Sequence, residues 1–108
     1  MTTPFVTSLR SRPSVIRLAA EGTAAITIRV EMPEVWDVVA VVVSPTEPVA
    51  AVKRRALEAL YPEAAMPDDF VVKLRGWEIL DESESLGDAG VLDGSILLIT
   101  HRRRRAVR

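Results

Sequence analysis

Residues 25–60 read AITIRVEMPEVWDVVAVVVSPTEPVAAVKRRALEAL, and two changes of hydrophobic period in this stretch decide the fold. Apolar and polar residues alternate over residues 25–32, which is typical of a strand with one buried face. A Pro-Glu pair then breaks the run before β-branched residues resume in WDVVAVVVS, residues 36–44, so the two runs predict a β-hairpin whose second strand begins at Trp36. The residues of the second strand expected to face inward are Val39, Val41 and Val43.

From about Pro48 onward the apolar period becomes helical. The preceding residues supply turn and cap chemistry, with Thr46 or Glu47 as the expected N-cap and Pro48 suited to the first turn. The helix is expected to end before Pro62. Its apolar stripe is predicted to comprise Val49, Val52, Ala56, Ala59 and Leu60. The residues predicted to face largely outward are Lys53, Arg54, Arg55 and Glu58.

The second half of the chain predicts two more strands around an acidic loop. Residues 70–75 alternate and turn at Gly76, and the segment LDESESLGDAG that follows is irregular, with Leu86 as its expected single anchor in the core. A turn at Asp93-Gly94 precedes the last strand. Its inward residues are predicted to be Leu97 and Ile99.

The length of 108 residues suits one modest domain. We expect a flexible extension over residues 1–24, one domain over residues 25–101, and an arginine-rich tail over residues 102–108. Cysteine is absent, which excludes disulfides and thiolate chemistry from this sequence. No apolar run approaches the roughly 20 residues of a membrane-spanning helix, and a cytoplasmic location is the default expectation.

The net charge of -1 hides a strong partition along the chain. Residues 1–20 carry three basic and no acidic side chains, residues 21–100 carry six basic and fifteen acidic ones, and residues 101–108 carry five arginines. The folded part is therefore expected to be acidic and both ends basic. Such ends can lie on the acidic body or reach an anionic partner.

The order strand, strand, helix, strand, short piece, strand resembles the ubiquitin-like β-grasp from about residue 25 to residue 105. The segments that carry the resemblance are VVVSPTEPVAAVKRRAL and VVKLRGWEILDESESLGDAGVLDGSILLIT. The resemblance implies an α+β fold in which a mixed sheet of four to five strands packs on one helix. The residue pattern agrees independently, since a helix with one apolar stripe and a sheet with one apolar face must bury each other.

The resemblance also bears on function. Conjugated relatives of ubiquitin end in two glycines, whereas the corresponding positions here are Arg105 and Ala106, so the resemblance implies a protein that is not conjugated. Ubiquitin's apolar recognition patch is altered too, because its positions correspond to Lys73, Leu98 and Thr100. Partners that read the ordinary patch are expected to fail on this surface.

Within the superfamily, the segment LGDAGVLDGSIL resembles the closing loop of small bacterial YukD-like accessory proteins of type VII secretion. This implies a noncatalytic protein-interaction module that serves a bacterial secretion assembly at the membrane. Two alternatives stay open: a divergent bacterial modifier, and a small ubiquitin-like subunit of a multicomponent monooxygenase. The residues show no nucleophile elbow and no phosphate-binding glycine loop, so we expect neither catalysis nor a cofactor.

Two surfaces are candidate partner-binding sites. Trp77, just after the Gly76 turn, is an exposed anchor, or else it folds back over the sheet edge or is covered by the N-terminal extension. The sheet face opposite the helix is predicted to carry an apolar patch, flanked by Lys73, that either binds a partner, forms a homodimer seam, or is covered by the N-terminal extension. The patch residues are Val38, Ala40, Val42, Val71 and Leu98. The covering residues proposed are Phe5, Val15, Ile16 and Leu18.

The tail is the third candidate. Its arginines are expected to tune attraction to an acidic protein partner rather than to bind nucleic acid, because no aromatic residue is interleaved for base stacking and the body is acidic. These residues are Arg102, Arg103, Arg104 and Arg105. The acidic loop lacks the calcium-loop spacing, and His101 has no second His or Cys nearby in sequence, so no metal site is expected.

Overall fold

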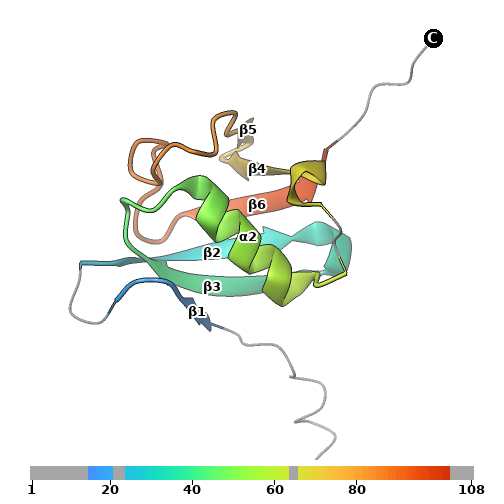
Figure 1. Cartoon of the computed structure of the whole chain (residues 1–108), viewed down its shortest axis with the longest axis horizontal. Helices are drawn as coiled ribbons and strands as arrows, with labels where there is room; N and C mark the ends of the chain where they lie inside the picture. The colour runs from blue at the N-terminus through green and yellow to red at the C-terminus, as the bar shows by residue number, and fades with distance from the viewer. Residues whose placement is uncertain (1–14, 21–23, 64–65, 103–108) are drawn as a thin grey trace, which may run out of the picture.

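The protein was analysed as a computed structural model that describes residues 15–20, 24–63 and 66–102 (Figure 1). These residues form one mixed sheet, one α-helix and two short 3-10 helices. In chain order the elements are β1 (Val15–Arg17), β2 (Ile26–Met32), η1 (Pro33–Val35), β3 (Asp37–Val43), α2 (Val49–Leu60), η2 (Pro67–Asp69), β4 (Phe70–Leu74), β5 (Trp77–Glu78) and β6 (Ile96–His101).

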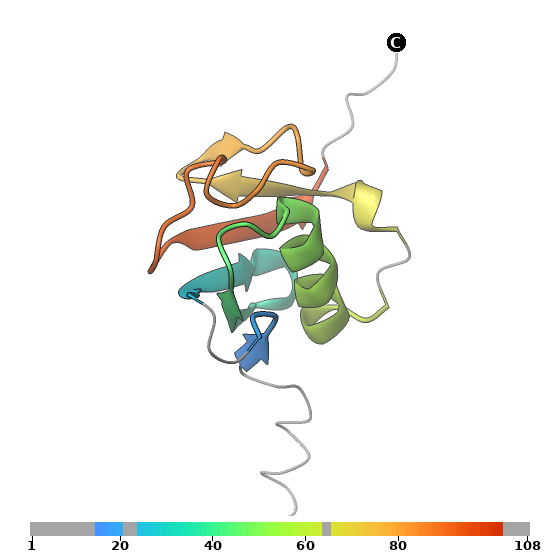
Figure 2. The same ribbon diagram turned by 60° about the vertical axis from the view of Figure 1, so that its left-hand side comes forward.

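The sheet has the strand order β1-β3-β2-β6-β4-β5. Its centre is the parallel pair β2 and β6, flanked by the antiparallel hairpin partner β3 on one side and by antiparallel β4 on the other. The helix α2 crosses one face of this sheet, as both ribbon views show (Figures 1 and 2). This is the predicted α+β arrangement, with six strands among the described residues instead of four to five.

The added strand is β1, which lies inside the segment predicted to be a flexible extension. It pairs in parallel with β3, and Ile16 opposite Val41 is only 4% exposed. The backbone N–H groups of Leu18 and Ala19 donate to the carbonyl of Val42 at 2.8 and 3.2 Å. The prediction of a loose extension is therefore wrong for residues 15–20. Burial of the Ile16 side chain stabilises this strand by about 1.5–3 kcal/mol. A strand of three residues is too short for its sequence pattern to reveal this burial.

The core lies between α2 and the helix-facing side of the sheet. The inward residues predicted for the second and last strands are all buried: Val39, Val41, Val43, Leu97 and Ile99. The helix contributes Val49, Val52, Ala56, Leu57 and Leu60 to the same cluster. Ala59 is only partly buried against it. The alternating pattern of β2 therefore assigned the buried face of the sheet correctly, and α2 ends at Leu60, before Pro62, as predicted.

The start of the helix differs from the prediction. Its N-cap is Pro48, and no side chain caps it. The first helical N–H groups, those of Val49 and Ala50, donate instead to the carbonyl oxygens of Glu84 and Glu82 at 3.0 and 2.8 Å. Helix N-termini leave such donors without an intrahelical partner, and here the acidic loop satisfies two of them.

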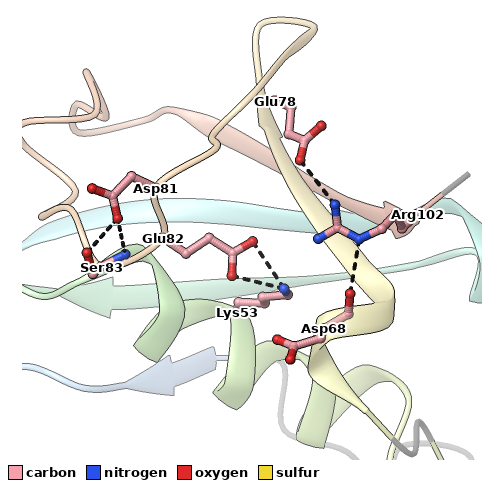
Figure 3. Close-up of polar contacts among 7 residues, drawn as sticks. All are labelled: Lys53, Asp68, Glu78, Asp81, Glu82, Ser83 and Arg102. Carbon is pink, nitrogen blue, oxygen red and sulfur yellow. Dashed lines mark hydrogen bonds and ion pairs between the residues drawn. The ribbon is translucent and has the colours of Figure 1, made fainter.

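Lys53 also departs from the prediction, since it is 3% exposed although it was expected to face outward. Its Nζ donates to both carboxylate oxygens of Glu82 at 2.9 and 3.1 Å (Figure 3). The partner lies 29 residues further along the chain, on a loop that folds over the helix. Within the segment LDESESLGDAG, Leu86 is the one buried residue, as predicted, and Ile79 and Val91 on either side of the segment are buried as well.

Candidate protein-binding surface

The outward side of the sheet, away from α2, is here called the outer sheet face. The pairing register places on it one alternate set of residues from each strand. Its apolar members are Val15, Val38, Ala40, Val42, Val71, Ile96 and Leu98. Its polar members in the same strands are Arg17, Thr27, Arg29, Glu31, Lys73 and Thr100.

The apolar part of the outer sheet face contains exposed residues and two depressions. Ile96, Val38 and Val15 are exposed, and Val42 and Leu98 are half-buried. A depression of about 450 Å³ between β4 and β6 borders Ile96 on one side, and one of about 350 Å³ over β2 and β3 borders it on the other. Ile96 was not among the predicted contact residues, although its place two residues before Leu98 puts it on the same face.

The outer sheet face is basic although the folded body is acidic. Arg17, Arg29 and Lys73 occupy its outward positions against the carboxylates of Glu31 in β2 and Glu78 in β5. The acidic groups gather instead in the loop that follows β5. Basic side chains on the outer sheet face and acidic side chains in this loop therefore occupy different parts of the domain.

Val71 was predicted to belong to the binding patch, but it is 5% exposed. Arg102 crosses from the end of β6 over the first part of β4: its Nε donates to the Asp68 carbonyl at 3.1 Å, and its Nη1 lies 3.7 Å from Glu78 Oε2 (Figure 3). A long arginine side chain covers apolar surface in this way while its guanidinium stays hydrated. Val71 is therefore not part of the exposed candidate surface, and Arg102 has two contacts within the domain.

Trp77 is 80% exposed and does not fold back over the sheet edge within the described residues. It pairs with Leu74, whose side chain faces the helix, so Trp77 belongs to the opposite side of the sheet from Lys73 and Glu78. A shallow groove there joins Trp77 and Leu80 to the acidic loop. The structure therefore separates Trp77 from the outer sheet face.

A second exposed tryptophan was missed by the sequence analysis. Trp36 was assigned to a strand, but it ends the turn between β2 and β3 with a φ of 55° and is 93% exposed. Positive φ is unusual for a bulky residue and marks a backbone fixed by its surroundings. Here the Trp36 N–H donates to the Pro33 carbonyl at 3.1 Å.

The same turn carries the carboxylate with a shifted pKa. Partial burial opposes ionisation of Glu34, but the His101 N–H and the Thr100 hydroxyl both donate to its Oε2 at 2.7 Å, and the net effect is a pKa below the ordinary value. These bonds tie η1 to the end of β6. Glu34 is thus placed to hold the hairpin against the last strand rather than to receive a proton.

The remaining predicted contacts on the N- and C-terminal segments lie outside the described residues: Phe5, Arg103, Arg104 and Arg105. The predicted cover of the patch is wrong for Ile16 and Leu18, because Ile16 enters the core and Leu18 packs against it. Only Val15 lies on the outer sheet face, at its edge.

The part of the chain that the structure describes contains no group of three His, Cys, Asp or Glu residues placed to hold a metal ion. None of its helices has the length and apolarity needed to cross a bilayer.

Comparison with solved structures shows the fold to be ubiquitin-like. The ubiquitin-like domain of an Arabidopsis thaliana protein superposes with a TM-score of 0.61 at 18% identity, over 84% of this chain and 93% of that one. The ubiquitin of Caldiarchaeum subterraneum gives 0.62 at 19% identity, over 77% and 100%. A designed protein based on ubiquitin gives 0.62 at 17%, over 81% and 100%. No protein-family model matches the chain, and neither does any curated protein.

Proposed function

We propose that this ubiquitin-like domain is a noncatalytic protein-interaction module that binds its partner through the outer sheet face. The observation that carries the proposal is the exposed Ile96, which lines two depressions, on the same face as the exposed Val38 and the half-buried Leu98. Exposed apolar side chains next to hollows that can receive a partner's side chains are the kind of surface that marks a contact.

The charges of the outer sheet face select the kind of partner. Arg29 and Lys73 border the two depressions, so a partner that presents aliphatic side chains next to carboxylates would complement this surface. Rim charges of this type mainly raise the association rate and suppress wrong partners, while the apolar centre supplies most of the affinity.

The finer assignment is an accessory component of a bacterial type VII-like secretion system. Its support is the resemblance of LGDAGVLDGSIL to the closing loop of YukD-like proteins. In this chain the first leucine of that segment, Leu86, is fully buried, and Gly90 and Gly94 adopt positive φ. These positions therefore serve the loop's conformation, and the assignment to secretion depends on identifying the partner.

The test is affinity capture from cells that express the protein, using Leu98→Glu and Ile96→Glu as variants and Met66→Glu as the matched control. Met66 is an exposed apolar residue that precedes β4, away from the outer sheet face. We expect the wild type and the control to retain the same proteins and both outer-face variants to lose them. Recovery of a membrane ATPase and small helical secreted proteins would support the secretion role. Retention of every partner by both variants would refute the outer sheet face as the binding site.

A further inference from the structure

The edge of the sheet at β3 is occupied by a strand from the same chain. Val15, Ile16 and Arg17 pair in parallel with residues 40–42 of β3, and two further N–H groups bond to the Val42 carbonyl. The edge of a sheet presents a row of backbone donors and acceptors that any suitable extended segment can satisfy. The pairing with β1 therefore shows that the β3 edge can bind an extended strand.

The side chains of this strand show what the edge selects. Ile16 enters the core cluster that α2 also lines, and Ala19 is buried three residues later. Val15 and Arg17 point outward and are exposed. The edge thus accepts a segment with one large aliphatic residue pointing inward and a small residue after it, and it tolerates a range of residues at the outward positions.

The resident strand has few attachments. Figure 2 shows β1 at the border of the sheet, beyond β3 and apart from the central strands. Among residues 15–20, Ile16 and Ala19 are the buried side chains, and Leu18 packs partly buried against the core. Elements with so few buried contacts open locally at a smaller cost than the core strands do. Detachment of β1 leaves the pairing of β2 with β3 and β6 unchanged.

We propose that the edge of β3 beside α2 is a second docking site, for an extended peptide of a partner protein with an inward-pointing aliphatic residue, and that residues 15–19 are an intramolecular occupant which this peptide displaces. The inference does not depend on the outer sheet face as a binding site, because the edge is used through backbone pairing and through a side chain on the opposite face.

An intramolecular occupant lowers the apparent affinity of the competing peptide. The peptide binds only the fraction of molecules in which β1 has detached, so its apparent dissociation constant is the intrinsic constant divided by that fraction. A variant whose β1 cannot insert should therefore bind the peptide at least about tenfold more tightly than the wild type.

The experiment uses the full chain and a fluorescein-labelled peptide VIRLAA, the sequence of residues 15–20, with binding measured by fluorescence anisotropy. Ile16→Glu removes the inserted side chain, and Val15→Glu is the control in the same strand, since Val15 is exposed. We expect Ile16→Glu to gain at least about tenfold in affinity and Val15→Glu to match the wild type. The peptide VERLAA, which lacks the aliphatic residue, should bind none of the proteins.

A second variant pair tests the same point if Ile16→Glu does not fold. Arg17 and Val42 are register partners, and the chain has no cysteine, so Arg17→Cys with Val42→Cys introduces its only two thiols. Neighbouring strands bring Cα atoms within disulfide range. The oxidised protein, with β1 locked in place, should bind the peptide at least about tenfold more weakly than the reduced one.

Two results would overturn the proposal. One is a folded Ile16→Glu variant with no gain in affinity, or an oxidised pair that binds as well as the reduced pair. The other is a wild-type dimer that Ile16→Glu abolishes and the peptide does not dissociate, because the occupant of the edge would then be a second copy of this chain.

Discussion

The two faces of β3 consist of nearly the same residue types, but one face is buried and the other is partly exposed. Val39, Val41 and Val43 are buried under α2, while Val38 on the other face is exposed and Val42 is half-buried. Side-chain chemistry in this strand does not distinguish the faces. The neighbouring strand does, since β2 turns Ile28 and Val30 toward the helix and charged residues away from it.

The comparison teaches that, in a strand apolar on both faces, the neighbouring strands determine which face is buried. The other face then remains an exposed apolar surface. The same division extends to the ion pairs. Lys53 and Glu82 meet on the helix side with little solvent, whereas Arg102 and Glu78 meet on the outer side in water.

The largest effect is expected from adjacent leucines of β6. Leu97→Ala should lower the free energy of unfolding by about 2–5 kcal/mol, because it leaves a cavity in the packed core. Leu98→Ala should cost less than about 1 kcal/mol, since Leu98 is half-buried on the outer sheet face. Urea unfolding of both variants measures the difference, and equal losses would contradict the division between the faces.

The next effect concerns the buried ion pair. Glu82→Ala should destabilise by about 2–3 kcal/mol, because it leaves the Lys53 ammonium buried without its partner; the figure is reduced from that of a fully buried pair because Glu82 is partly exposed. Lys53→Met should cost less, since it fills the same space with an apolar chain and leaves Glu82 able to reach water. The measurement is thermal or urea unfolding of the two single variants, and a larger loss for Lys53→Met would refute this reading of the pair.

A smaller effect is expected on the outer side. Arg102→Ala removes an exposed ion pair whose atoms are 3.7 Å apart, so stability should change by less than about 1 kcal/mol. The change should nevertheless expose Val71, which a fluorescent probe of apolar surface can detect. Arg102→Lys keeps a long aliphatic side chain and serves as the control, with Val71 still covered.

The smallest effect depends on pH and involves Glu34. Its pKa is lower in the folded chain than in the unfolded one, so the carboxylate adds stability at pH values above its unfolded-state pKa, and this contribution disappears as pH falls through the folded-state pKa. The excess of wild type over Glu34→Gln in unfolding free energy should therefore be largest at pH 7 and shrink as pH falls through the folded-state pKa. Thr100→Val removes one of the hydrogen-bond donors and should reduce the difference.

The fold could be predicted because its signals are local. The alternation of β2, the change of period at α2 and the turn at Gly94 each lie within a few residues, and together they predict one helix across a mixed sheet. The inward residues followed directly, since Leu97 and Ile99 have the period of a strand.

The features that were missed depend on partners distant in sequence. Burial of Lys53 requires a glutamate 29 residues away, and the strand at Ile16 requires the edge of β3. Trp36 was assigned to a strand because its left-handed conformation has no residue-type signal, as a glycine or asparagine would have given. For the candidate surface, the sequence predicted that the outer face is apolar. The burial of Val71 and the exposure of Ile96 could not be predicted in the same way, because both depend on side chains from neighbouring strands.

The parallel pairing of β2 with β6 has a consequence for the order of biosynthesis. The first long strand to leave the ribosome has as its central neighbour the last strand of the sheet, more than sixty residues later. The hairpin and the helix can form early, but β4 and β5 cannot join the β2–β3 hairpin until β6, which lies between β2 and β4, has emerged. Nascent chains that end before residue 96 should therefore remain open to proteases and chaperones, and protection should arise abruptly once residue 101 clears the exit tunnel.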